Sequence, residues 1–172
     1  MIETLATIVF LGAMATAAFT DLTRYEIPNW ISLVVAAAFV VSAIGDSLDL
    51  QTIAWHVAMG VAVLVAGFAL FALGVFGGGD AKLLAAAALW FGPAPLLKFL
   101  VYVALVGGLL GIVIICLRRM PLPPEWTEKR WVSRLYSPEQ GMPYGIAIAI
   151  AAGLVCVPAL VALSMAADGA AS

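Results

Sequence analysis

The chain has 172 residues, of which 65% are hydrophobic and 10% are charged, and its mean hydropathy is +1.12. Soluble domains contain roughly 45–50% apolar and about 25% charged residues, so an ordinary soluble domain is excluded and a membrane protein is indicated. The length suits a single domain. A formal net charge of −2 gives no indication of a nucleic-acid partner.

The apolar residues form long, continuous stretches. Backbone groups in lipid must be hydrogen-bonded internally, which leaves helices and closed barrels as possible folds. Barrel strands alternate in hydropathy and these stretches do not, so they favour helices. Because one crossing needs about 20 apolar residues, the sequence predicts an all-α polytopic membrane protein with about six transmembrane helices. The predicted spans are residues 2–20, 29–44, 53–76, 81–91, 96–117 and 144–166.

Two connections between the predicted spans have distinctive compositions. Residues 92–95 contain two prolines and one glycine, and they predict a tight turn. Residues 118–143 form the one long polar segment, which mixes aromatic and basic side chains. This mixture is typical of a segment lying along the lipid headgroups, and an ordinary solvated loop is the alternative. The residues concerned are Trp126, Lys129, Arg130, Trp131, Arg134 and Tyr136.

Lysine and arginine are distributed unequally between the two faces that six spans create. Cytoplasmic connections of membrane proteins are enriched in these residues. The sequence therefore predicts that the basic face is cytoplasmic and that both termini are extracytoplasmic, together with the acidic turn containing Asp46 and Asp49. The basic face collects Arg24, Lys82, Arg118, Arg119, Lys129, Arg130 and Arg134, and the other face holds Lys98.

Two acidic residues stand at the cytoplasmic ends of predicted spans. Asp21 follows the first span and Asp80 precedes the fourth, so the topology brings both to the same membrane depth. Acids at such depth usually face a bundle interior or a wet cavity. Two neighbouring carboxyls cannot both ionise easily and are expected to share one proton. One can then act as general base on a water molecule while the other donates to a scissile carbonyl.

Each acid also has an ordinary structural explanation. Asp80 could cap the fourth helix, and Asp21 could be a plain interfacial residue. The neighbouring residues favour a site. Three glycines before Asp80, namely Gly77, Gly78 and Gly79, are expected to allow positive φ angles, close approach of another chain, and open access to the acid.

The residues after Asp21 predict an ordered connection to the second span. Pro28 restricts the residue before it to extended conformations and suits the first turn of a helix. Asn29 is expected to act as a cap or a hydrogen-bond donor. This connection would hold Asp21 in a fixed place.

In three places the sequence resembles the type IV prepilin peptidases, most closely the small peptidase-only branch that serves tight-adherence (Flp-type) pili. Asp21 followed by Ile-Pro-Asn at 27–29 is similar to the family's first aspartate box. Residues 77–83, Gly-Gly-Gly-Asp-Ala-Lys-Leu, resemble its GxGD box. Residues 142–145, Met-Pro-Tyr-Gly, resemble the start of its final helix.

The resemblance implies a GxGD aspartyl membrane protease fold, with Asp21 and Asp80 as catalytic residues. It also implies cleavage of prepilin or pseudopilin leader peptides at the cytoplasmic face of the bacterial inner membrane. Lys82 would tune the carboxylates, line the path of the substrate, or anchor the chain at the headgroups. Glu26 is a candidate for leader binding, and Tyr144 is expected to pack at the mouth of the site.

One departure from the family pattern concerns the N-terminal domain. Many members carry a cytoplasmic domain with paired CxxC motifs and methylate the new terminus. This sequence passes from Met1 into its first span without a CxxC motif. We therefore expect a single membrane peptidase domain over residues 1–172, with no N-terminal methyltransferase domain, no metal and no cofactor. Cys116, Cys156 and His56 are interpreted as ordinary buried or interfacial residues.

Two other functions compete with the protease. Acids beside glycine-rich helix ends also suit an ion-coupled transporter, although such sites usually lie near the membrane midplane. A non-catalytic subunit of the pilus-assembly machinery is the other alternative, but a scaffold has no need of both acids. The sequence leaves the oligomeric state and the individual pilin substrate open.

Overall fold

The protein is entirely helical in the part that the computed structural model describes, which is residues 2–120, 130–137 and 141–170, with only the backbone described at 2–3, 130 and 159–170. This confirms the predicted all-α class. The helices are α1 (Ile2–Arg24), α2 (Asn29–Gly45), α3 (Leu50–Ala72), α4 (Gly78–Phe91), α5 (Pro93–Arg118), α6 (Arg130–Tyr136) and α7 (Tyr144–Ala170).

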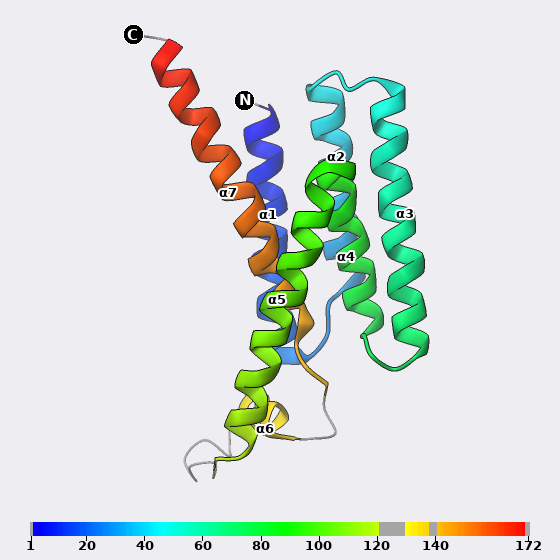
Figure 1. Ribbon diagram of the computed structural model, residues 1–172, viewed down its shortest axis with the longest axis vertical. Coiled ribbons are helices and arrows are strands. Elements are labelled where there is room, and N and C mark those ends of the chain that lie inside the picture. The colour runs from blue at the N-terminus through cyan, green and yellow to red at the C-terminus, as the bar shows by residue number, and fades with distance from the viewer. Residues whose placement is uncertain (1, 121–129, 138–140, 171–172) are drawn as a thin grey trace.

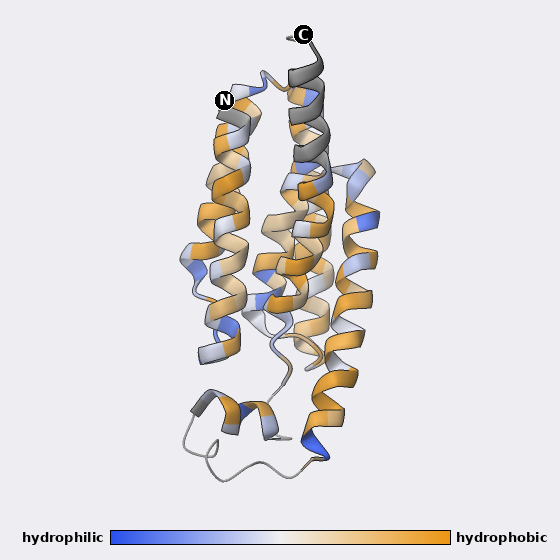
Figure 2. Cartoon of the chain, turned by 90° about the vertical axis from the view of Figure 1, so that its left-hand side faces the viewer, coloured by the Kyte–Doolittle hydropathy of each residue, from blue (hydrophilic) through white to orange (hydrophobic). Residues whose placement is uncertain are grey.

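The helices form an up-and-down bundle. Helices α1 to α5 and α7 run along the long axis, and the short α6 lies across one end (Figures 1 and 2). At this end, called the α6 end below, α1 and α5 finish and α4 begins. The start of α1 and the end of α7 are both at the opposite end (Figure 1). The α1–α2 and α3–α4 connections, which flank the two predicted acids, are therefore both at the α6 end.

Three helices are long and apolar enough to cross a membrane by length and composition: Thr4–Arg24, Leu50–Ala72 and Pro93–Arg118. Helix α2 and residues Tyr144–Pro158 are apolar but shorter. Helix α4 has 14 residues, or about 21 Å at ~1.5 Å per residue, against a hydrocarbon core of about 30 Å. The hydrophobic colouring of Figure 2 extends along the helices of the bundle. The chain is thus a membrane protein, and three of the six predicted spans meet the length criterion.

Helix α4 is the central helix of the bundle, because α2, α3, α5 and α7 all pack against it. It is rich in alanine, and small side chains let helix backbones approach closely within a membrane. Its buried residues are Asp80, Ala81, Leu83, Leu84, Ala85, Ala86, Ala87, Ala88 and Phe91. A short central helix, most of whose surface is covered by its neighbours, can hold an acid inside the bundle.

The C-terminal end of α4 is fixed by aromatic and polar contacts. The Phe10 ring lies 4.6 Å from that of Trp90, and Trp90 Nε1 donates to the Val35 carbonyl at 2.9 Å. His56 Nδ1 is hydrogen-bonded to the Leu89 carbonyl, and its ring stacks on Phe39. His56 therefore belongs to the end of α4 that is opposite the acids.

Two predicted boundaries are wrong. Residues 92–95 are not a turn, because only Gly92, with a φ of +58°, separates the helices and Pro93 already begins α5. Proline is tolerated there, since the first N–H groups of a helix have no intrahelical acceptor. Similarly, α4 begins at Gly78, so Gly78 and Gly79 belong to the helix instead of a loop.

Helix α6 is fastened to the ends of α1 and α5 by two arginines. Arg118 Nε donates to the Leu135 carbonyl, and Arg134 Nη1 donates to the Arg24 carbonyl, each at 2.8 Å. Val132 is the buried residue of α6 itself. Trp126 and Lys129 lie outside the described residues, so the headgroup location of the segment at 118–143 stays a prediction.

Glycines mark the closest helix contacts. A Cβ atom on Gly107 would lie 2.7 Å from the Tyr144 ring, and one on Gly111 would lie 3.1 Å from Met142 Sδ. At Gly108 it would meet nothing within 4 Å. The tightest contact between backbones is that of α3 with α4, where a Cβ on Gly67 would lie 3.0 Å from Ala81 Cβ and 3.2 Å from its Cα.

Gly67→Val is expected to lower the free energy of unfolding by about 1–3 kcal/mol, because the added methyl groups force α3 away from α4. The measurement is the thermal unfolding midpoint in detergent. Gly108→Val is the matched control and should keep the midpoint, since its side chain enters open space. Equal midpoints for the two variants would contradict the packing described.

Candidate active site

Asp21 lies in the last turn of α1 and is only 6% exposed. Its Oδ2 accepts a hydrogen bond of 2.7 Å from the Gly145 N–H. Gly145 is the second residue of α7, where N–H groups have no acceptor within the helix and the helix dipole is positive. The N-terminus of the last helix therefore fixes the orientation of a carboxyl on the first.

Asp80 occupies the third position of α4 and is 8% exposed. Gly77 is the N-cap residue, and its N–H donates to Asp80 Oδ2 at 3.2 Å. The side chain thus reaches back to the cap as the acid of a capping box does. The capping explanation accounts for one oxygen only, because Asp80 Oδ1 is buried without a hydrogen-bond partner among the described residues. A buried polar atom of this kind calls for a water molecule, a proton or a ligand.

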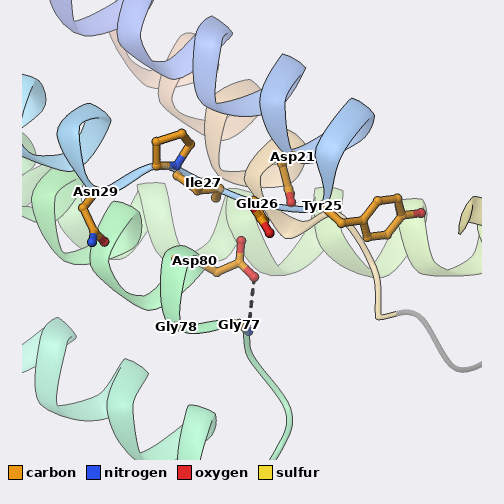
Figure 3. Close-up of a pocket in the computed structure, with 10 residues that line it drawn as sticks. Asp21, Tyr25, Glu26, Ile27, Asn29, Gly77, Gly78 and Asp80 are labelled. Atoms are coloured by element: carbon orange, nitrogen blue, oxygen red, sulfur yellow. Dashed lines mark hydrogen bonds between the residues drawn. The ribbon is translucent and has the colours of Figure 1, made fainter. Parts of the chain in front are cut away.

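The two carboxyls point toward one another from α1 and α4 (Figure 3). A cavity of about 400 Å³, called the first cavity, has the α1–α2 connection in its wall, and another of about 330 Å³, the second cavity, is bounded by the α3–α4 connection and the start of α7. The residues that line both cavities are Asp21, Tyr25, Gly77 and Asp80. A chain passing from one cavity to the other would cross the acid pair.

The glycines before Asp80 permit close contacts. A Cβ on Gly77 would lie 2.8 Å from Asp80 Oδ2, and one on Gly79 would lie 3.1 Å from Ile27 Cβ, whereas Gly78 faces the Phe71 ring at ordinary distance. The prediction of positive φ angles here is wrong: Gly77 has a φ of −72°, and the described glycines with positive φ are Gly74 and Gly92. The reason is that Gly78 and Gly79 already have helical conformations.

The connection after Asp21 begins with a left-handed residue. Tyr25 has a φ of +58°, and its N–H donates to the Asp21 carbonyl at 2.9 Å, which ends α1 abruptly. Its hydroxyl is buried without a partner in the described part of the chain, and burial raises the pKa of this phenol above its ordinary value. Figure 3 shows the ring directed away from Asp80.

The remaining residues of the connection differ in part from their predicted roles. Pro28 is the N-cap residue of α2 instead of a residue of its first turn, and Asn29 makes no side-chain cap. Asn29 is an acceptor instead of a donor, because its Oδ1 receives a hydrogen bond of 2.9 Å from Lys82 Nζ. Glu26 is exposed and lines the first cavity.

Lys82 and Tyr144 lie on different sides of the acids. Lys82 lines neither cavity at the acid pair, and its bond to Asn29 joins the start of α4 to the start of α2. Tyr144 lines the second cavity, with its ring 4.8 Å from that of Phe76. The structure thus brings together Asp21, Asp80, Gly77, Gly78, Gly79, Glu26, Pro28 and Asn29 around the first cavity.

Two residues of the site were missed from the sequence. Gly145 was noted only as part of a motif, and its role as the donor to Asp21 depends on a contact across nearly the whole chain. Tyr25 lines both cavities. No sequence pattern indicates that a tyrosine directly after a helix will line a cavity. The one available signal was that Tyr25 lies between Asp21 and Pro28 in the sequence.

The fold is an apolar helical bundle, and its site is a pair of buried carboxyls that face each other. These two features place the protein in the class of helical membrane proteins with paired acids at a cavity. Within that class, the chain belongs to the type IV leader peptidase family, whose model matches residues 8–112. It is therefore a protease of the leader-peptidase type. The matched range contains both acids, and residues 142–145 lie beyond it. Comparison with curated proteins and with solved structures gave no match.

Gly145→Val is expected to reduce leader-peptide cleavage by about 100-fold, because displacing a reacting group by about 1 Å can have an effect of this size. A Cβ at this position would lie 2.9 Å from Asp21 Oδ2 and 3.0 Å from Ile27 Cδ1. The measurement is the cleavage rate in membranes at matched protein level. Gly153→Val, also in α7, is the control, since nothing lies within 4 Å of its added Cβ. Wild-type rates in Gly145→Val would show that this N–H does not position Asp21.

Proposed function

We propose that the protein is an aspartyl endopeptidase that removes the leader peptide of prepilins or pseudopilins, with Asp21 and Asp80 as its catalytic residues. The observation that carries the proposal is the pair of buried carboxyls facing each other between two cavities, each oriented by a backbone N–H. Structural carboxyls in apolar surroundings are normally paired with cations. Here the hydrogen bonds that the two acids accept in the described part of the chain come from peptide N–H groups instead.

The proposed reaction uses one proton shared by the pair. The ionised carboxyl takes a proton from a water molecule as the water oxygen attacks the scissile carbonyl carbon, and the protonated carboxyl donates to the carbonyl oxygen. The tetrahedral gem-diol then breaks its C–N bond as the first carboxyl returns its proton to the leaving amine and the second carboxyl takes one from a hydroxyl of the intermediate. The unpartnered Asp80 Oδ1 supports this scheme, because it offers a place for the water or the shared proton.

Charge supports the placement of the site at the cytoplasmic face of the bacterial inner membrane. The described cationic side chains at the α6 end are Arg24, Lys82, Arg118, Arg119 and Arg134, and Lys98 lies near the start of α5 at the opposite end. Under the positive-inside rule the α6 end is cytoplasmic. Glu26 provides a negative charge at the first cavity, where a basic leader would approach.

The topology that goes with this proposal has six crossings, α1 to α5 and α7, with both termini extracytoplasmic. Helix α4 is too short to span the hydrocarbon core unaided. A helix that starts below the membrane surface suits a bond cleaved there, because its first turn carries Asp80 and the two cavities lie beside that turn. The resemblance to the peptidase-only branch further suggests a tight-adherence pilin as substrate.

Asp21→Asn and Asp80→Asn are each expected to slow prepilin cleavage by about 10²–10⁴-fold, since general acid and base groups contribute factors of this size. Both variants should accumulate in the membrane, because asparagine keeps the shape of the side chain and its acceptor oxygen. Asp46→Asn is the control, as Asp46 is exposed at the far end of α2. Unchanged cleavage in either catalytic variant would refute the aspartyl mechanism.

The pH profile of kcat/KM for prepilin cleavage is expected to be bell-shaped. At low pH both carboxyls are protonated and no base remains, and at high pH both are ionised and no acid remains. The measurement is the initial cleavage rate in detergent across the pH range in which the protein stays folded. A rate that only rises with pH would point to a single base and contradict the shared proton.

A further inference from the structure

A third cavity, of about 440 Å³, lies between α2 and α3 with α4 as its floor. Its lining residues follow the 3.6-residue period of helices. They are at positions 57, 60, 61 and 64 of α3 and at 82, 85, 86 and 89 of α4. The lining is thus one face of each helix over two turns. We call this cavity the α2–α3 groove.

The groove has the surface of a helix-binding site. Its rim carries Leu33 and Val61, which are 68% and 53% exposed, and its floor carries Ala85 and Ala86. Small residues at the floor let another helix backbone come close, and apolar residues on the rim surround its side chains. Because the groove extends over two helical turns, it can accommodate about two turns of a bound helix.

The groove adjoins the first cavity. Asn29 lines both the groove and the first cavity, and Lys82, which lines the groove, follows Asp80 by two residues. The hydrogen bond between Lys82 Nζ and Asn29 Oδ1 marks the junction. A polypeptide leaving the groove at its α6 end would therefore arrive at the acid pair.

The junction is polar where the rest of the groove is apolar. A helix must unwind to present a peptide bond to the acids, and unwinding frees N–H and C=O groups that need partners in a low-dielectric region. Lys82 and Asn29, which bond to each other in this structure, carry further donor and acceptor capacity at that point. An acyl chain would use the apolar walls but would not explain a polar junction that leads into the acid cavity.

We infer that the α2–α3 groove binds an apolar membrane-spanning helix of the substrate, adjacent to the scissile bond, and delivers its unwound end past Lys82 and Asn29 to Asp21 and Asp80. This inference rests on the proposed function. The groove would then select substrates that carry a membrane helix, and the acid cavities would act on the segment that emerges from it.

The test compares two substrates and two variants of α2. The substrates are a full-length tight-adherence prepilin and a short peptide with the same cleavage site but no apolar helix. Ser32→Phe fills the groove from its α2 side. Ala37→Phe is the matched control, because Ala37 is on the same helix but lines a separate apolar cavity between α1 and α2.

The expected result is that Ser32→Phe lowers the ratio of kcat/KM for full-length substrate to that for peptide at least about tenfold, mainly through KM, since a tenfold change corresponds to about 1.4 kcal/mol of binding. Ala37→Phe should keep the wild-type ratio. A wild-type ratio in Ser32→Phe, or an equal loss on both substrates, would overturn the inference. If the wild-type protein cleaves neither substrate, the proposed function itself fails and the inference with it.

A second measurement does not require the variant with the filled groove to fold. A photoreactive residue at the exposed Leu33, in an Asp80→Asn background that retains substrate, should crosslink to the apolar helix of the prepilin. The same residue at position 37 should not. Crosslinks from position 33 to lipid alone would assign the groove to an acyl chain and overturn the inference.

Discussion

The hydrogen bond from the Gly145 N–H to Asp21 Oδ2 joins the first helix of the chain to the last, and the rest of the site depends on it. A carboxyl inside an apolar bundle needs donors, and the first turns of helices are where peptide N–H groups have no other acceptor. The protein meets this requirement twice, with α7 at Asp21 and with Gly77 before α4 at Asp80. The same arrangement leaves the space between the two carboxyls open on both sides.

The position of helix α4 in the bundle follows from this local requirement. Its start must lie inside the bundle for Asp80 to face Asp21, so the helix is short, and its neighbours must approach it closely, so its side chains are small. Alanines at 85–88 satisfy the second condition. The glycines of α3 at 60 and 67 bring that helix close enough to cover α4 on one side. The proposed function thus depends on packing far from the acids themselves.

The sequence was sufficient to predict the helical class, the pairing of Asp21 with Asp80, and most of the first cavity, because hydropathy and loop order determine which helix ends meet. The predicted boundaries failed where glycine and proline occur in first helical turns. Gly78 and Pro93 were assigned to loops, although a first turn loses no intrahelical hydrogen bond by containing them. Gly145 and the α2–α3 groove depend on contacts between helices distant in sequence, which no local pattern encodes.

The left-handed backbone of Tyr25 has a consequence for how the protein tolerates change. A non-glycine residue at positive φ has a conformational free energy of about 1 kcal/mol or more above the ordinary regions, and glycine or asparagine would relieve it. Either replacement would also remove the ring that forms a wall of both cavities. Selection for higher thermal stability would therefore be expected to favour glycine or asparagine at position 25. The selected proteins would process substrate poorly, so stability and turnover impose opposite demands on this one residue.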